Sequence, residues 1–302
     1  MSIRCGILAR LAGRNYRRFD AAHRGAPRGL GPSMRKLVIA CLIQFALLTQ
    51  ARSWGPEGHS IVAEIAQRRL SPEAAAKVRE ILGENASLAS IASWADDYRA
   101  LHLDSAGWHF VDIPLADEDY EEGRDCAPSP EGDCVIHELA RSVRDLTDPA
   151  SSGAQRRDAL KFVVHLVGDV NQPLHTVGEL HGYNDLAVCY FSSPAKNDCV
   201  ASNLHSVWDV GLIRSIFWDW GGYVEYLETD WLPAHNDPAL DAGTPVDWAL
   251  EAHKAARDVA VAGVTMNAHL GADYLAAARP TLDRQLAVAG LRLARTLNEA
   301  LK

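Results

Sequence analysis

The segment RRDALKFVVHLVGDV, residues 156–170, is apolar on nearly every side when it is drawn as a helix. A helix that is apolar all round is normally buried at the centre of a domain. This one also carries His165 and Asp169, which are four residues apart and therefore share one helix face. Because a buried charge needs a partner or a metal ion, the segment predicts a central helix beside a polar site.

Other segments repeat the helical spacing of apolar residues. Residues 58–70 have an apolar stripe, and residues 71–82 begin with Ser71 as a helix cap and Pro72 in the first turn. Three further helices are expected over residues 134–146, 245–264 and 280–301.

Two segments, 115–133 and 178–203, are instead rich in Gly, Asp, Pro and Ser. No run of alternating strands and no internal repeat is found. The sequence therefore predicts a single all-α domain with two long functional loops.

The N-terminal 53 residues have the features of a segment that is removed. Residues 34–53 combine a basic start, an apolar core over 37–48 and small residues at positions 51 and 53, which is typical of a secretory signal peptide. The core is too short for a membrane span, and no later stretch reaches about 18 apolar residues. We therefore expect a protein that is secreted or periplasmic, with no membrane anchor after cleavage. An uncleaved N-terminal anchor is the alternative.

Residues 1–33 are rich in Arg and Gly without helical or strand periodicity. They are interpreted as a disordered upstream extension, with Met34 as the true start and a transit-like arm as the alternative. The mature domain would then span residues 54–302.

The predicted mature domain is strongly acidic. Ten of the 30 Lys and Arg, but only one of the 39 Asp and Glu, lie in residues 1–53. Residues 54–302 therefore carry 20 basic and 38 acidic side chains, a formal net charge of −18. Taken alone, this charge argues against a nucleic-acid binder, which is usually basic. Bound divalent cations would reverse the sign locally.

The cysteines of the mature domain form two close pairs, Cys126 with Cys134 and Cys189 with Cys199. An even number of cysteines in an exported protein favours disulfides, one in each long loop. Zinc thiolates are the alternative, although the spacings do not match those of tight zinc knuckles.

Histidine and aspartate recur at spacings that suit a metal site. His165 and Asp169 are followed by His175, and HSVWD supplies a second pair, His205 and Asp209. Imidazole with carboxylate suits zinc in a site that is not purely structural. Asp96 and His109 are further polar positions among aromatic residues. Taken alone, Asp96 is better explained as a helix-end carboxylate and His109 as a hydrogen-bonded core histidine.

Signal cleavage would add one more ligand set. It would free the α-amine of Trp54, which can chelate a metal together with the carbonyl oxygen of the same residue. His59, five residues later, can join them. The alternative is an ordinary exposed first residue with His59 on the surface.

Five motifs occur in a fixed order: Trp54 with His59, SWAD, WHFVD, HLVGD with QPLH, and NLHSVWD. Together they closely resemble the S1/P1 nuclease family, the zinc-dependent single-strand-specific nucleases of fungi and plants with bacterial relatives. The resemblance runs from Trp54 to the C-terminal GLRLARTLNEAL.

The resemblance implies an all-α fold shared with zinc-dependent phospholipase C, and three zinc ions. It assigns the first zinc to Asp96, His109, His165 and Asp169. It assigns the second to His175, His205 and Asp209, and the third to the amine and carbonyl of Trp54 with His59 and Asp169, which would bridge the first and third ions.

The resemblance also implies a substrate site and an activity. Arg99 would contact the phosphate and act in catalysis with Asp96 and Asp169, Phe110 would stack on a base, and Asp112 would accept a hydrogen bond from the base edge. The implied activity is hydrolysis of single-stranded DNA and RNA to 5′-phosphates, with 3′-nucleotides as further substrates. Without the resemblance, Arg99 is consistent with a surface cation, Phe110 with a core residue and Asp112 with a turn residue.

The sequence departs from the family pattern at two positions. Asn171 stands where the family usually has histidine, and Tyr183 replaces the second glycine of a Gly-Gly-Asn motif, in which Asn184 matches the asparagine and is expected to bind substrate. Asn171 is not at a ligand position, so the expected zinc set is unaffected.

Two other functions remain open on the sequence. One is a phospholipase C on the same fold, although that family places its next histidine further along and ends its last motif in glutamate. The other is a zinc-binding protein without catalysis. We expect a monomer in each case.

Overall fold

The computed structural model describes residues 54–191 and 199–302, and the fold is given for these residues. The predicted extension over 1–33 and the predicted signal peptide over 34–53 lie outside the described residues, as do residues 192–198 of the second predicted loop. Within the described ranges, no helix is long and apolar enough to cross a membrane.

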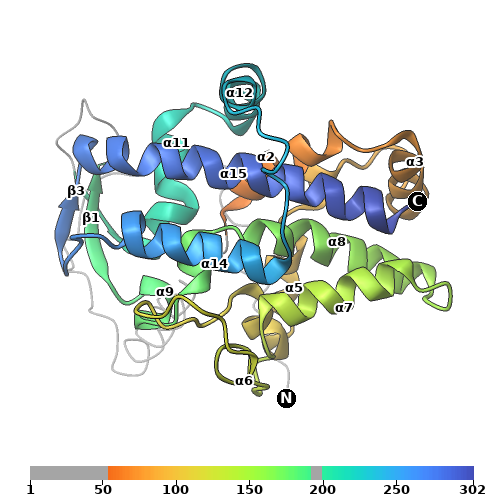
Figure 1. Cartoon of the computed structure of the whole chain (residues 1–302), viewed down its shortest axis with the longest axis horizontal. Helices are drawn as coiled ribbons and strands as arrows, with labels where there is room; N and C mark the ends of the chain where they lie inside the picture. The colour runs from red at the N-terminus through yellow and green to blue at the C-terminus, as the bar shows by residue number, and fades with distance from the viewer. Residues whose placement is uncertain (1–53, 192–198) are drawn as a thin grey trace, which may run out of the picture. The chain divides into compact units, whose positions relative to one another are not determined.

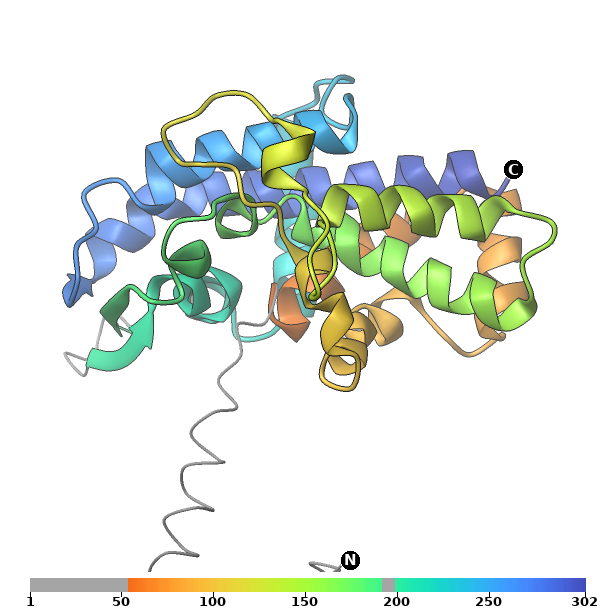
Figure 2. The same cartoon turned by 90° about the horizontal axis from the view of Figure 1, so that it is seen from below.

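The predicted central helix is present as α8 (Gly153–Asp169). Ser152 caps its first turn together with Gln155, and from Ala159 onward nearly every side chain is buried. Helix α7 (Val135–Thr147) precedes α8 and packs along it as a helical hairpin (Figures 1 and 2). The apolar run therefore forms the core as expected and places His165 and Asp169 inside the molecule.

The longest helix, α15 (Ala272–Ala300), crosses the molecule and packs on both α2 (Pro56–Gln67) and α8 (Figure 1). The sequence predicted that this helix begins at Pro280, which was wrong. Pro280 lies inside the helix, because the alanine-rich residues before it are good helix formers and extend the helix by two turns.

Further helices surround this core. Ser71 caps α3 by accepting a hydrogen bond from the backbone N–H of Ala74 over 3.1 Å, and Pro72 is its first residue, as predicted. The predicted helix over 245–264 is α14 (Pro245–Ala255), which continues as a π-helical turn over Ala256–Ala260. The remaining helices are α3 (Pro72–Leu82), α4 (Leu88–Ile91), α5 (Trp94–Arg99), α6 (Glu122–Asp125), α9 (Leu180–Tyr183), α10 (Leu204–Ser206), α11 (Leu212–Ile216), α12 (Trp220–Tyr226) and α13 (Leu232–Ala234).

The structure also contains a small sheet, which the sequence did not predict. Strand β1 (Ala187–Phe191) lies between β2 (Cys199–Asn203), to which it is antiparallel, and β3 (Ala268–Leu270), to which it is parallel. The strands are too short to give a clear alternation, and β3 comes from a distant part of the chain. The segment 178–203, predicted as a loop, therefore contains two strands and the short helix α9.

Both predicted disulfides are present, Cys126 with Cys134 and Cys189 with Cys199. The first joins the end of α6 to the start of α7, and the second joins β1 to β2. Apart from the small sheet, the protein is mostly helical, and the all-α prediction is confirmed.

Candidate metal centre

Two helices and the end of a 3-10 helix bring a buried cluster together around Asp169. His59 comes from α2, His165 and Asp169 from α8, and His109 from the end of a 3-10 helix over Leu103–His109; all four are fully buried. Oδ2 of Asp169 lies 3.0 Å from Nδ1 of His109 and 3.1 Å from Nε2 of His165. Oδ1 lies 3.4 Å from Nε2 of His59. The two carboxylate oxygens thus face different histidines, as a bridging ligand requires.

Asp96, on α5, lies at the edge of this cluster. Its Oδ1 is 3.9 Å from Nε2 of His165 and 3.6 Å from a guanidinium nitrogen of Arg99. Asp96 and Arg99 are both largely buried, with side chains 10% and 11% exposed. Asp96 can therefore contact a metal ion while Arg99 supplies a positive charge next to it.

A second cluster is formed by His175, His205 and Asp209. His175 lies in the 3-10 helix Pro173–Thr176, His205 in α10, and Asp209 in a π-helical turn over Val207–Gly211. Asp209 Oδ2 is 3.4 Å from Nε2 of His205, and its Oδ1 is 3.8 Å from Nε2 of His175. All three side chains are buried.

The histidines of the second cluster are oriented by backbone carbonyls. Nδ1 of His175 donates to the carbonyl oxygen of His109 over 2.8 Å, and Nδ1 of His205 donates to that of Gly182 over 2.6 Å. The opposite nitrogen, Nε2, is buried in both residues and has no hydrogen-bond partner within the described part of the chain. A buried imidazole nitrogen without a donor is costly unless it binds a cation, and metal-binding histidines are typically fixed in this way.

The first cluster shows the same pattern, and the donor atoms fall into three groups. Nε2 of His109, both ring nitrogens of His59 and Oδ1 of Asp169 are buried without a hydrogen-bond partner among the described residues. In each group the ligand atoms lie within 4.8 Å of one another. The groups are His59 with His165 and Asp169, Asp96 with His109 and His165, and His175 with His205 and Asp209. Imidazole and carboxylate donors at this density fit zinc.

Burial also changes the protonation of these ligands in the metal-free protein. Burial raises the pKa of Asp209 to about 7 and lowers the pKa of His109 to about 4. Burial opposes the charge of Asp169 as well, but His165 and the hydrogen bonds from the histidines outweigh it and hold the pKa of Asp169 well below its usual value. Without metal, the two carboxylates therefore differ in charge near neutral pH.

Trp54 lies between the two clusters. Its side chain is fully buried, and its indole N–H donates to the carbonyl oxygen of Gly168 over 3.0 Å. The next residue, Gly55, donates its backbone N–H to the carbonyl oxygen of Asp209 over 2.9 Å. Residue 54 is thus anchored beside ligands of both clusters rather than exposed.

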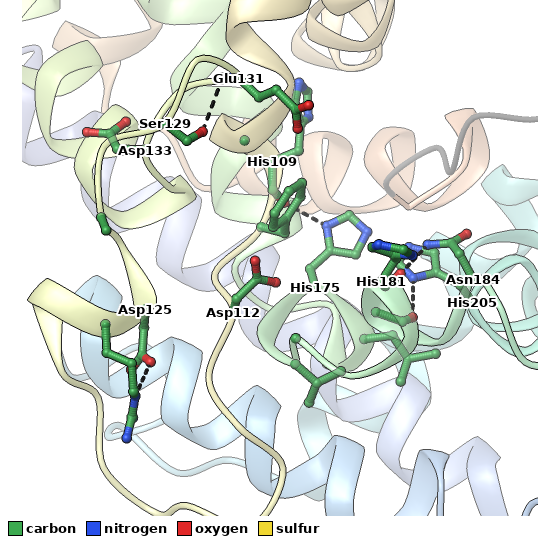
Figure 3. A pocket seen from close by; sticks show the side chains of 18 of the residues that line it. His109, Asp112, Asp125, Ser129, Glu131, Asp133, His175, His181, Asn184 and His205 are labelled. Atoms are coloured by element: carbon green, nitrogen blue, oxygen red, sulfur yellow. Dashed lines mark hydrogen bonds and ion pairs between the residues drawn. The ribbon is translucent and has the colours of Figure 1, made fainter.

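A cavity of about 380 Å³ opens beside the candidate metal ligands (Figure 3). His109, His175 and His205 contribute to its wall. The residues that the sequence assigned to substrate binding also line it: Arg99, Phe110, Asp112 and Asn184. The cavity size is in the range of ligand pockets.

Asp112 differs from the other lining residues in its electrostatics. Solvent reaches its side chain, but the cavity walls remove enough water to raise the pKa of Asp112 to about 6, against the opposing effect of His181. The carboxyl group therefore changes charge close to neutral pH.

Two features of the site were not predicted from the sequence. Gln172 donates from its side-chain amide to Asp209, and His181 lines the cavity next to Asn184. The spacing of metal ligands indicated neither residue, since Gln172 is not itself a ligand and His181 belongs to a segment predicted as a loop.

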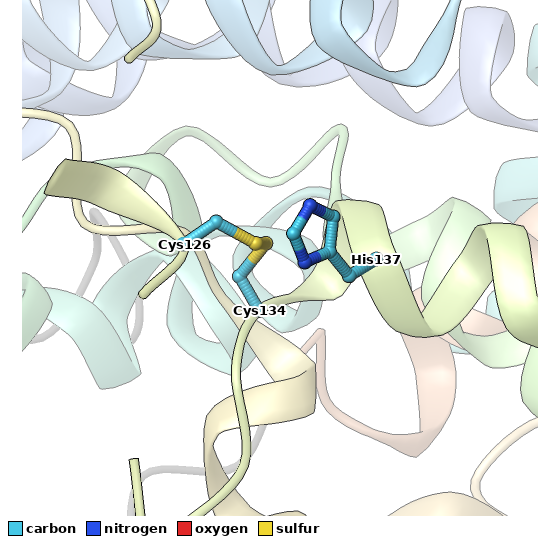
Figure 4. A group of neighbouring side chains, drawn as sticks. All are labelled: Cys126, Cys134 and His137. Atoms are coloured by element: carbon cyan, nitrogen blue, oxygen red, sulfur yellow. A yellow bond between two sulfur atoms is a disulfide. The ribbon is translucent and has the colours of Figure 1, made fainter. Parts of the chain in front are cut away.

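A further candidate group, Cys126 and Cys134 with His137, is not a metal site (Figure 4). The two sulfurs are bonded to each other, so no thiolate is available. His137 instead lies 3.1 Å from carboxylate oxygens of both Asp133 and Glu122. The zinc-thiolate alternative is therefore wrong for this pair.

The S1/P1 nuclease family model matches residues 54–302, the whole described domain and the segment that carries both clusters. The chain belongs to the S1/P1 nuclease family. It is similar to nuclease PA3 of a Penicillium species and to nuclease P1 of Penicillium citrinum. Each is 32% identical over 278 residues, which cover 82% of this chain and 97% of the relative. Endonuclease 2 of Arabidopsis thaliana is 32% identical over 286 residues, which cover 86% of this chain and 96% of the relative. This protein is therefore a nuclease, and the zinc dependence of the family fits the buried donor groups described above.

Proposed function

We propose that this nuclease is an exported phosphodiesterase with three zinc ions that hydrolyses single-stranded DNA and RNA to 5′-phosphates and also accepts 3′-nucleotides. The observation that carries the proposal is the carboxylate of Asp169, whose two oxygens face different buried histidines. The relatives named nuclease P1 and nuclease S1, the latter from Aspergillus oryzae, support the same reaction class.

The ligands are assigned to the ions as follows. Asp169 would be shared by two of the ions, and Trp54 would contribute both its α-amine and its carbonyl oxygen. The first ion would be held by Asp96, His109, His165 and Asp169, the second by His175, His205 and Asp209, and the third by Trp54, His59 and Asp169.

Bound zinc would supply a nucleophilic water at neutral pH and absorb negative charge that develops on the phosphoryl oxygens. The chain itself positions the substrate. Arg99, held next to Asp96, pairs with the phosphate, and Phe110 stacks on a base. Stacking contributes about 1–3 kcal/mol per base and needs an unstacked strand, which accounts for a single-strand preference.

Asp112 and Asn184 complete the substrate site in the same cavity. Asp112 accepts a hydrogen bond from a base edge when it is ionised. Asn184 is held in place because its side-chain amide donates to the carbonyl oxygen of His181 over 2.7 Å. The bound zinc ions also account for substrate binding by an acidic protein, because they add about six positive charges at the point where phosphate binds.

The proposal includes removal of residues 1–53. Cleavage after Ser53 frees the amine of Trp54. The indole of Trp54 is already anchored to Gly168, and the backbone N–H of the next residue, Gly55, is anchored to Asp209. The disulfides fit an oxidising compartment, and we expect the exported protein to be a monomer.

A native mass spectrum of the exported protein, followed by hydrolysis assays, tests the proposal. We expect a monomer that begins at Trp54 and carries three zinc ions, and faster turnover of single-stranded DNA than of phosphatidylcholine. A different first residue, or two tightly held ions, would contradict the Trp54 site. Faster phosphatidylcholine turnover would instead identify a phospholipase C, and full metal content without phosphoester hydrolysis would identify a zinc-binding protein.

A further inference from the structure

The segment that follows the second-cluster ligand His175 has an unusual backbone. Four consecutive residues, Leu180 to Tyr183, have positive φ angles of 50°, 51°, 62° and 62°. L-amino acids adopt this left-handed region rarely, and mostly as single residues. Strain of this kind persists when the surroundings impose it, and it is concentrated at functional sites.

Several hydrogen bonds hold this left-handed segment in place. The backbone N–H of Asp185 donates to the carbonyl oxygen of Leu180 over 3.1 Å, and that of Tyr183 donates to Glu179 over 3.0 Å. The carbonyl of Gly182 accepts from Nδ1 of His205. A Cβ at residue 182 would lie 2.7 Å from the carbonyl oxygen of Leu174, so glycine is required there. The close approach of the Leu174 carbonyl explains why residue 182 is glycine. It does not explain the position of the His181 side chain.

The side chain of His181 is 86% exposed and still lines the cavity (Figure 3). Core packing therefore does not fix its position. Instead, Nδ1 of His181 lies 2.6 Å from Oδ2 of Asp185, which orients the imidazole ring. Asp112 is close enough for the charge of His181 to oppose the rise in its pKa. His181 thus lies at the open side of the cavity, facing the proposed base site.

The two arginines of the cavity wall already lie next to carboxylates. Arg124 pairs with both Asp117 and Asp125, and Arg99 is held next to Asp96 at the first cluster. A nucleic-acid strand with one nucleotide in the cavity would continue outward. Its next phosphate would then pass the exposed rim. His181 is a rim residue that can meet it: when both ring nitrogens carry a proton, Nδ1–H donates to Asp185 and Nε2–H donates to an anion.

We propose that His181, oriented by Asp185, binds the phosphate of the nucleotide adjacent to the one in the cavity, and thereby favours oligonucleotides over mononucleotides. This inference rests on the proposed nuclease function and concerns a contact outside the metal ligands. His181 is here a substrate-binding residue, and Asp185 is its positioning residue.

Steady-state kinetics of H181N and H181K tests the proposal in the zinc-loaded, full mature protein. Asparagine tolerates the left-handed backbone, so H181N removes the imidazole without forcing a refolded turn. Lysine supplies a permanent positive charge at the same position. H235N is the matched control, because His235 is an exposed histidine that stacks on Trp231 and does not line the cavity.

For H181N we expect the KM of a single-stranded octanucleotide to rise about three- to tenfold, the range for one solvent-exposed charged hydrogen bond. Its zinc content should match the wild type, and its KM for a 3′-mononucleotide should change much less than its KM for the octanucleotide. The slope of log KM against log salt should fall by about 0.7, which corresponds to one lost phosphate contact on a single strand. H181K should recover most of the affinity, and D185N should shift KM in the same direction by less.

An unchanged octanucleotide KM in H181N would overturn the proposal. So would an equal loss on both substrates together with loss of zinc, because the segment would then act through His205. Failure of the proposed function is distinguishable, since the wild-type protein itself would hydrolyse neither substrate.

Discussion

The side-chain amide of Gln172 donates to Oδ1 of Asp209 over 2.5 Å, while its oxygen accepts from the backbone N–H of Leu174. Gln172 lies in the turn between Asp169 of the first cluster and His175 of the second. This one side chain therefore fixes a carboxylate of the second cluster to the backbone that connects the two clusters.

Replacing Gln172 by Met should weaken zinc binding at His175, His205 and Asp209. Methionine keeps the volume but removes both hydrogen bonds, and outer contacts of this kind are worth about 10–100-fold in metal affinity. Chelator competition with zinc quantification measures the effect. Q67M is the control, because Gln67 makes a comparable hydrogen bond to the backbone N–H of Leu88 away from the metal centre. Equal zinc affinity in Q172M and the wild type would contradict the prediction.

Replacing Gly168 by Ala should disturb the His59 group. A Cβ at residue 168 would lie 2.8 Å from Nδ1 of His59, closer than such contacts occur, so the imidazole must move. We expect one zinc ion to be lost in a native mass spectrum, and a destabilisation of about 1–3 kcal/mol from overpacking.

G153A is the matched control for this substitution. Gly153 begins the same helix, and a Cβ there meets nothing within 4 Å. Three zinc ions retained in both variants would show that His59 is not a ligand or that it adapts to the added methyl group.

The metal-free protein should become less stable as its buried carboxyl Asp209 ionises. Its folded pKa of about 7 is raised by burial above the unfolded value of about 4. The contribution of this group is therefore fully present below pH 4 and is lost as the pH rises through 7, by up to about 4 kcal/mol.

Urea unfolding of the chelator-treated wild type and D209N between pH 4 and 8 isolates this group from the other titrating ligands. The wild type should lose stability relative to D209N as the pH rises. Added zinc should reverse the order at pH 7, because the ionised carboxylate becomes a ligand. A pH-independent difference between the two metal-free proteins would refute the assignment.

Removing the disulfide between Cys126 and Cys134 should weaken substrate binding in the cavity more than it lowers the zinc content. The residues between these cysteines include four that line the cavity, Ala127, Ser129, Glu131 and Asp133. The double variant C126A/C134A should lose about 2–3 kcal/mol of stability, the value for so short a loop. Its KM for oligonucleotides should rise while its zinc content stays at the wild-type level. Loss of zinc in a folded double variant would mean that this loop also holds the ligands in place.

Much of the metal centre was predictable because its ligands recur at short, regular spacings. The apolar segment around His165 and Asp169 predicted α8 and its burial, and the i, i+4 pair of His205 and Asp209 predicted a second group of donors. Helical periodicity depends on neighbouring residues, so the sequence carries this information locally.

The family motifs carried the prediction further. They indicated Asp96 and His109, whose own surroundings in the sequence favour structural roles. The structure brings both side chains next to His165.

Tertiary structure alone decided the contacts between distant segments. Strand β3 pairs with β1 across nearly 80 residues of chain. A strand of three residues is too short for its local sequence pattern to predict such a pair. The carbonyl groups of His109 and Gly182 orient His175 and His205, yet every residue has a carbonyl, so sequence cannot tell which one is used. The same holds for Gln172 and His181, whose roles follow from where the folded backbone places them. The residue types thus determined which chemistry is available, and packing decided which atoms meet, because those contacts form between parts of the chain that are far apart until it folds.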